Sequence, residues 1–340
     1  MHTKSFTSAH ITKSFILMIL LLGYTLSMAQ APVEENGRLH VKGQYLYNQK
    51  GEKVQLSGVS LGWHNWWGYY FNAGVVDRIA SEWKASIIRC PIGIDADKQC
   101  YNHNPQYAYS LIDSVVHAAI RNGIYVIVDF HSHNNNLELA KEFFSHITLK
   151  YGNTPNVIYE IWNEPTDITW DEIKEYASQI VPIIRKHAPE SLIIIPTPFW
   201  DQLVNLAADN PIHGYDNLLY AVHFYAASHK QPNQEKVHYA IKKELPIIFS
   251  ECAGMEADGN GMIDTASWKS WIDLANKNKI SWIAWSISDK NETCSMLTPG
   301  TPINGKNWKE NNLKPWAIIV RNELHKSATV QPQNFNQQEK

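Results

Sequence analysis

The apolar run Ile124-Tyr125-Val126-Ile127-Val128-Asp129-Phe130 is followed by the amphipathic stretch Leu137–Tyr151 and then by a second apolar run, Val157–Trp162. Both runs are short, apolar and rich in β-branched residues, as buried strands are. The stretch between them has the apolar spacing of a helix. Strands that alternate with helices in this way form a parallel sheet. These residues therefore predict an α/β fold.

The same unit recurs along most of the chain. Runs of strand type lie at Val54–Ser60, Ser86–Pro91, Ile124–Phe130, Val157–Trp162, Leu192–Pro196, Leu218–Phe224, Pro246–Glu251 and Ser281–Ser286. Helical stretches between them include Val75–Lys84, Tyr107–Arg121, Leu137–Tyr151, Trp170–His187 and Thr265–Asn278. Eight strands close a (β/α)8 TIM barrel, which we expect as a single domain. An open doubly wound sheet is the competing architecture, although no GxGxxG motif supports its nucleotide-binding form.

The segments at the two ends of the chain differ from this repeat. Lys4 and Lys13 precede an apolar stretch that is too short to span a bilayer comfortably. After it, Ser27-Met28-Ala29 offers the small residues of a cleavage site. A signal peptide over residues 1–29 is therefore favoured over a membrane anchor. The polar residues 326–340 are expected to form a flexible tail, which leaves residues 30–325 for the domain. Alternation of apolar and polar residues from Arg38 to Leu56 predicts a short N-terminal β-hairpin over one end of it.

Composition limits the classes of function. The chain has 340 residues, of which 44% are hydrophobic and 19% charged, and its formal net charge is −3. This composition supports a large buried core, and no Lys/Arg block resembles a nucleic-acid footprint. We expect a secreted protein, extracellular or periplasmic, with no nucleic-acid partner and no stable membrane association. Its cysteines, Cys90, Cys100, Cys252 and Cys294, allow three full disulfide pairings, and a zinc site is a weaker alternative.

Polar residues end six of the predicted strands, namely Arg89, His131, Asn163 with Glu164, His223 with Tyr225, Glu251, and Trp285. The loops after barrel strands build the functional site, so these side chains are expected at one face. Glu164 and Glu251 would face each other there. Two carboxyls that flank a glycosidic bond are what its hydrolysis requires, one protonated and one ionised.

Neighbouring residues predict which carboxyl has which role. Arg89 beside Glu251 would lower the pKa of that carboxyl, and Tyr225 could donate a hydrogen bond to it, so Glu251 is the expected nucleophile. Glu164 is then the expected acid/base, and Asn163 could bind the sugar 2-hydroxyl.

Other interpretations of these residues stay open. Glu164 could stabilise a helix N-terminus, and Glu251 could be a structural partner of Arg89. His131 and His133 could be metal ligands of a barrel metallohydrolase. A carbohydrate-binding protein without catalysis is the alternative from another class of function.

Ordered motifs connect these residues to a known family. They are Arg89-Cys90-Pro91, Val128-Asp129-Phe130-His131-Ser132-His133, Ile161-Trp162-Asn163-Glu164-Pro165, His223-Phe224-Tyr225, Phe249-Ser250-Glu251 and Trp285-Ser286-Ile287-Ser288-Asp289-Lys290. Together with Leu56–Trp63 they resemble glycoside hydrolase family 5, and more narrowly its bacterial endoglucanase (cellulase) subgroup, from about Leu39 to Leu324.

The resemblance implies a retaining endo-β-1,4-glucanase that acts on β-glucan polysaccharide without cofactor or metal, and we expect a monomer. Glu164 would be the acid/base and Glu251 the nucleophile. The supporting residues would be Arg89, His131, Asn163, His223 and Tyr225, with Trp285 as a stacking platform and Trp66, Lys290 and Glu292 on the non-reducing side. A β-mannanase, xyloglucanase or lichenase of the same family is the alternative.

Two positions depart from the family pattern. Many relatives have a histidine where this chain has Gly62, and His64 lies two residues further on. Whether His64 substitutes for that histidine is open. After the nucleophile many relatives have Trp-Gly, but this chain has Cys252-Ala253, and a bridge between Cys252 and Cys294 is conceivable.

Overall fold

The computed structural model describes residues 30–329. The expected signal peptide, residues 1–29, and the end of the expected tail, residues 330–340, lie outside the described residues. The chain divides into a short unit, residues 1–31, and a compact unit that begins at Pro32, and the following description concerns the second unit.

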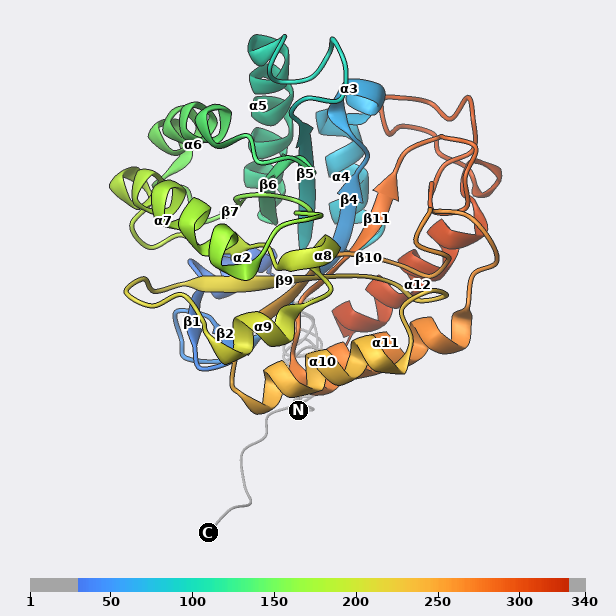
Figure 1. Cartoon of the computed structure of the whole chain (residues 1–340). Helices are drawn as coiled ribbons and strands as arrows, with labels where there is room; N and C mark the ends of the chain where they lie inside the picture. Colours follow the sequence, from blue (N-terminus) through green and yellow to red (C-terminus); the bar gives the residue numbers. More distant parts are fainter. Residues whose placement is uncertain (1–29, 330–340) are drawn as a thin grey trace, which may run out of the picture. The chain divides into compact units, whose positions relative to one another are not determined.

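Eight parallel strands form a closed barrel in the order β10-β11-β4-β5-β6-β7-β8-β9 (Figure 1). Their bounds are β4 (Ser57–Leu61), β5 (Ile87–Gly93), β6 (Tyr125–His131), β7 (Val157–Glu160), β8 (Ile193–Ile195), β9 (Leu218–Tyr225), β10 (Ile247–Ala253) and β11 (Trp282–Ile287). Each overlaps one predicted strand, so the predicted TIM barrel is confirmed. The first barrel strand begins later than predicted because Val54 belongs to a different sheet.

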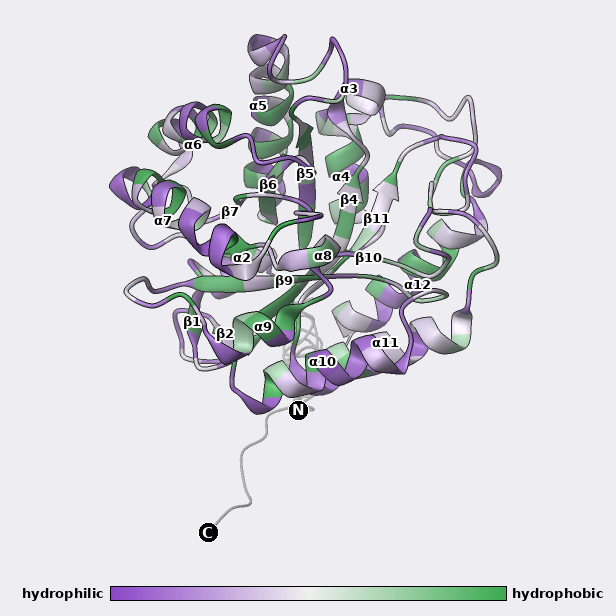
Figure 2. Cartoon of the chain, viewed as in Figure 1, coloured by the Kyte–Doolittle hydropathy of each residue, from purple (hydrophilic) through white to green (hydrophobic). Residues whose placement is uncertain are grey.

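Helices follow the strands around the outside of the barrel. They are α4 (Ala73–Ser81), α5 (Pro105–Asn122), α6 (Leu137–Tyr151), α7 (Trp170–His187), α10 (Gln231–Lys242), α11 (Thr265–Asn278) and α12 (Pro315–Thr329). Shorter elements are α2 (Pro32–Asn36), α3 (His64–Trp67), η1 (Gly68–Tyr70), α8 (Pro198–Asp201), α9 (Val204–Asp209) and η2 (Glu310–Asn312). The helices carry both hydrophobic and hydrophilic residues, as expected for elements with one face on the barrel (Figure 2).

Helix prediction was accurate where the apolar stripe is strong. The bounds of α6, α7 and α11 are those predicted, and α7 begins with a capping box in which Thr169 and Glu172 bond each other's backbone N–H groups. Helix α10 was missed, since it buries only Val237 and Ala240. Helix α12 continues through Thr329, past residue 325, where the domain was predicted to end.

A small antiparallel sheet closes the N-terminal end of the barrel. It has three strands, β1 (His40–Lys42), β2 (Tyr45–Tyr47) and β3 (Lys53–Val54), where the sequence predicted a two-stranded hairpin. Leu46 and Val54 pack in one apolar cluster with Ile127, Ile158 and Ile194 from inside the barrel. The sheet therefore covers this end with apolar side chains and leaves the carboxyl ends of the strands for function.

Between residues 30 and 329, no helix is at once long enough and apolar enough to cross a bilayer.

Candidate active site

A cleft of about 670 Å³ lies at the carboxyl ends of the barrel strands. Of the predicted site residues, it is lined by Glu164, Glu251, His131, His223, Tyr225, Trp66, Trp285, Lys290 and Glu292. The other two, Arg89 and Asn163, are buried, and hydrogen bonds connect them to the cleft residues. The strands thus bring all predicted positions together.

Arg89 on β5 organises the buried charges under the cleft. Its guanidinium donates to Glu160 at 2.6 Å, to Glu251 at 2.9 Å and to the Asn163 Oδ1 at 2.6 Å. A fourth contact, 2.9 Å long, reaches Asp129. All five donors of an arginine lie in one plane, so one side chain can hold several oxygens in fixed positions. Burial opposes the charged form of this arginine, but the buried acids around it outweigh burial and raise its pKa.

Glu251 on β10 is held from two sides. Arg89 Nη1 donates to its Oε2, and the Tyr225 hydroxyl donates to its Oε1 at 2.8 Å. Strand register places it beside His223, its partner on β9. These two donors leave the carboxyl in one orientation at the floor of the cleft.

Glu164 follows β7 and lies against His223. The His223 Nδ1 is 2.8 Å from the Glu164 Oε1, and the His223 Nε2 is 3.0 Å from the Ser250 hydroxyl. The backbone of Glu164 is fixed as well, since its N–H donates to the Ser132 carbonyl at 3.2 Å. His133 lies on the solvent side, with Nδ1 3.6 Å from Glu164 Oε2.

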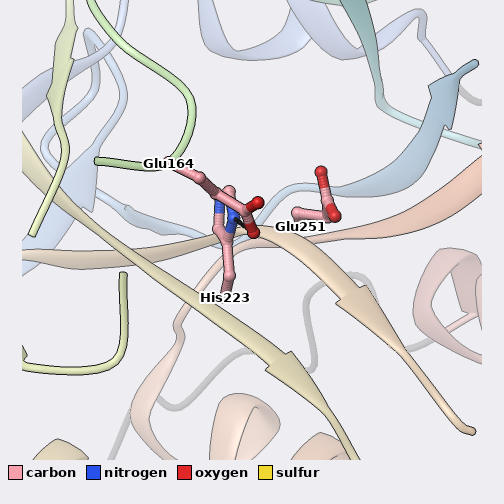
Figure 3. Close-up of side chains that lie close together, drawn as sticks. All are labelled: Glu164, His223 and Glu251. Atoms are coloured by element: carbon pink, nitrogen blue, oxygen red, sulfur yellow. Dashed lines mark hydrogen bonds and ion pairs between the residues drawn. The ribbon is translucent and has the colours of Figure 1, made fainter. Parts of the chain in front are cut away.

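The three groups converge at one point. One ligand-type atom from each of Glu164, His223 and Glu251 lies within 4.8 Å of the others (Figure 3). That spacing alone would suit a metal ion, but these atoms already bond one another, Arg89, Tyr225 and Ser250. A guanidinium 2.9 Å from Glu251 also repels a cation. His131 and His133 are not part of this group, which is contrary to the metallohydrolase interpretation.

Charge interactions shift the pKa of both carboxyls. Burial opposes ionisation of Glu164, but the hydrogen bond and charge of His223 outweigh it and lower its pKa. Burial and then the Glu164 charge raise the pKa of Glu251. Arg89 and the Tyr225 hydroxyl act to lower that pKa, as predicted, but burial and the Glu164 charge outweigh them. Burial opposes the charged form of His223 too, yet the acids around it raise its pKa well above the usual value.

Aromatic rings form the wall on one side of the cleft. Trp285 stacks on His131 with ring centres 5.5 Å apart and an interplanar angle of 3°. His131 is fixed by a 2.6 Å contact between its Nδ1 and Asp129. The Trp63 ring packs edge to face on His131, with ring centres 4.2 Å apart, and also contacts the ring of Trp66. Trp66 is 47% exposed. Trp66 therefore offers an open ring face to a ligand.

Comparisons with known proteins agree with this geometry. The family model for cellulase, glycosyl hydrolase family 5, matches residues 47–291. The chain belongs to glycosyl hydrolase family 5. Endoglucanase N of Pectobacterium atrosepticum is 35% identical over 320 residues, which cover 91% of this chain and 71% of that protein. Endoglucanase Z of Dickeya dadantii is 37% identical over 300 residues, 86% of this chain and 68% of that protein.

Solved structures of family members superpose closely. The catalytic domain of Thermobifida fusca endoglucanase Cel5A has a TM-score of 0.82 and 33% identity, over 87% of this chain and 100% of that domain. A structure from Cytophaga hutchinsonii has a TM-score of 0.85 and 38% identity, over 88% of this chain and 98% of that one. A variant of the Thermobifida domain was solved with cellotetraose. This chain is therefore a glycoside hydrolase of family 5.

The first departure from the family pattern is settled by packing. His64 is buried, and its Nδ1 accepts the Gly93 N–H at 2.9 Å, so it faces away from the cleft and does not replace the missing histidine. Burial lowers the pKa of His64 to about 4. A side chain at Gly62 would lie 3.1 Å from the Trp67 ring. Trp67 and Ser288 thus occupy the space in front of Gly62.

The second departure alters no catalytic group. All four cysteines are buried and free, so no bridge joins Cys252 and Cys294. The Cys252 thiol donates to the Ile283 carbonyl at 3.2 Å, toward the next strand. Cys294 lines the cleft near Glu292, which forms an ion pair with Lys290.

Several cleft residues were missed in the sequence. They are Trp63, Trp67, Phe199, Trp200, Gln202, His229 and Asp258. The cluster of tryptophans directly after the first barrel strand was a usable signal for Trp63 and Trp67. The Phe199-Trp200 pair follows β8, where the functional loops of a barrel begin, and could have been found in the same way.

Proposed function

We propose that this family 5 glycoside hydrolase is a secreted, retaining endo-β-1,4-glucanase that hydrolyses internal bonds of cellulose or a related β-glucan. The observation that carries the retaining mechanism is the spacing of Glu164 and Glu251. Their closest oxygens lie within 4.8 Å. Retaining enzymes place the two carboxyls about 5–5.5 Å apart, whereas inverting enzymes leave about 6.5–9.5 Å for a water molecule.

The proton for the first step is available in the Glu164–His223 hydrogen bond. It lies on His223 when Glu164 is ionised and on Glu164 when His223 is neutral, and the 2.8 Å distance allows transfer between them. With the proton on Glu164, the negative charge that raises the pKa of Glu251 and the positive charge of His223 that lowers it are both removed, and Arg89 and Tyr225 remain to favour the ionised Glu251. The pair can therefore reach the state that catalysis needs, a protonated Glu164 facing an ionised Glu251.

In the first step Glu251 attacks the anomeric carbon while Glu164 gives its proton to the leaving oxygen. Arg89 and Tyr225 hold the attacking carboxyl in place. In the second step Glu164 takes a proton from a water molecule whose oxygen attacks the anomeric carbon, so the bond between the sugar and Glu251 breaks and both carboxyls return to the starting state. Because the Asn163 Oδ1 already accepts from Arg89, its amide N–H groups are left for the sugar 2-hydroxyl.

The lining of the cleft supports a long glycan as substrate. Trp66 and Trp285 lie on one side, and Phe199 and Trp200 line it as well. Flat aromatic rings suit the apolar faces of sugars, while the Lys290–Glu292 pair offers charged groups to hydroxyls. Endoglucanase N, Endoglucanase Z and the Thermobifida domain are endoglucanases by name, which supports a β-1,4-glucan for this chain. Secretion rests on the signal-like residues 1–29.

The test is release of reducing sugar from a soluble cellulose derivative, with mannan and xyloglucan in parallel. Glu164→Gln should lower the rate by about 10²–10⁴, and Glu251→Gln should abolish it. Glu175→Gln, on the exposed surface of α7, is the matched control and should be unchanged. Activity that survives in both variants, or an α-configured first product by NMR, would overturn the proposal.

A further inference from the structure

Asp201, at the end of α8, is a buried acid with no part in the steps above. Its side chain is fully buried, and its Oδ1 accepts the backbone N–H of Thr197. Its Oδ2 has no hydrogen-bond partner among the described residues. A buried carboxyl oxygen without a donor costs free energy, so the position calls for a compensating role.

The open Oδ2 faces the proton-sharing pair. It lies 3.5 Å from the His223 Nδ1, the same nitrogen that is 2.8 Å from Glu164. The other ring nitrogen of His223 is occupied by Ser250. Asp201 and Glu164 therefore compete for a single N–H.

The backbone is strained to place this acid. Phe199, Trp200 and Asp201 have φ values of 58°, 52° and 57°, a left-handed conformation that is uncommon for residues other than glycine. The Trp200 N–H donates to the Pro165 carbonyl at 2.9 Å, which ties the turn to the segment that carries Glu164. Such strain persists where it serves a site. Here the left-handed turn places Phe199 and Trp200 in the lining of the cleft and Asp201 in the interior below the cleft.

We propose that Asp201 is a positioning residue for the acid step: its Oδ2 holds the His223 Nδ1 in line with Glu164 and so determines how readily Glu164 acts as the proton donor. The inference rests on the proposed role of Glu164. Titratable groups that interact with His223 from other elements are Glu160, Glu164, Glu251, Asp129, His131 and His229. Of the acids, only Asp201 and Glu164 reach its Nδ1 within 4 Å.

Leaving-group dependence separates this role from a structural one. A cello-oligosaccharide such as cellopentaose has a poor leaving group that needs a proton, whereas 2,4-dinitrophenyl β-cellobioside does not. Asp201→Asn and Asp201→Ser should lower kcat/KM for cellopentaose about tenfold, a fraction of the usual acid-catalysis effect. For the dinitrophenyl substrate, kcat/KM should stay within about twofold. Asp209→Asn, on neighbouring α9, is the matched control and should change neither value.

Glu164→Gln, measured alongside, separates the two proposals. If it lowers kcat/KM equally for both substrates, the acid role of Glu164 fails. If it slows cellopentaose alone while the Asp201 variants slow both substrates or neither, the positioning role is overturned. Failure of both Asp201 variants to fold would make Asp201 a structural residue and would overturn it too. In the Glu164→Gln background, Asp201→Asn should give no further loss on cellopentaose.

Discussion

The same strands form both ends of the barrel, but their side chains are apolar at the N-terminal end and charged at the carboxyl end. On β5, Ile87 belongs to the apolar cluster at the N-terminal end, and Arg89, two residues further on, holds the buried acids under the cleft. On β7, Ile158 and Glu160 repeat this arrangement. Residues two apart lie on the same face of a strand, so on β5 and β7 this face changes from apolar to charged between one inward-facing residue and the next.

This difference teaches how the protein tolerates its active site. The apolar end gains free energy from burial, whereas buried charges cost free energy unless they are paired. Arg89 pairs with three carboxylates at once, those of Asp129, Glu160 and Glu251. Stability from one end of the strands thus supports an arrangement at the other end that exists for chemistry.

Arg89→Met should break the charged end most severely. It leaves three buried carboxyls without their cation, a change that typically costs about 3–5 kcal/mol. The free energy of unfolding in urea should fall by that amount, and activity should be lost even where the protein is folded. An active variant of near-normal stability would show that the acids are held by something other than Arg89.

Ile158→Ala should damage the apolar end alone. Removal of a buried isoleucine side chain costs about 2–5 kcal/mol. Because Ile158 lies in the N-terminal cluster, kcat at a temperature where the variant stays folded should be unchanged. A large drop in kcat would mean that the two ends are not independent.

His64 sharpens the comparison, because it is a titratable group near the active-site end that should affect stability only. Its pKa of about 4 in the folded protein is below the ordinary value of 6.5, so the unfolded chain binds the additional proton. Stability from this group is complete above pH 6.5 and is lost toward pH 4, by about 1.4 kcal/mol per pH unit. His64→Gln, which keeps an acceptor for the Gly93 N–H, should make the free energy of unfolding in urea depend less on pH in that window. If the free energy of unfolding changed with pH as steeply in His64→Gln as in the native protein, this assignment would be contradicted.

Tyr225→Phe should have the smallest effect. It removes one hydrogen bond to Glu251, at 2.8 Å, and leaves Arg89 in place. We expect kcat/KM to fall by about tenfold, the equivalent of about 1.4 kcal/mol, with the melting temperature little changed. A variant with full activity would show that Arg89 alone orients the nucleophile.

The barrel and most of the site could be predicted because apolar runs that stop at ionisable residues mark strand ends. The pattern found Glu164 and Glu251 at the mouth of the barrel. Which way His64 points could not be predicted, since that depends on its contact with the Gly93 N–H and on the packing of Trp67 and Ser288 beside Gly62. Asp201 was missed because a left-handed turn of non-glycine residues has no sequence signature.

The central claim is that Glu251 attacks the sugar and Glu164 supplies the proton. It is tested most directly by incubating the enzyme with a 2-deoxy-2-fluoro cellobioside that carries a good leaving group, followed by mass spectrometry of the digested protein. The account predicts one added cellobiosyl group on the peptide that contains Glu251, formed in Glu164→Gln as well but not in Glu251→Gln. Label on another peptide, or none while the native enzyme turns over substrate, would contradict it.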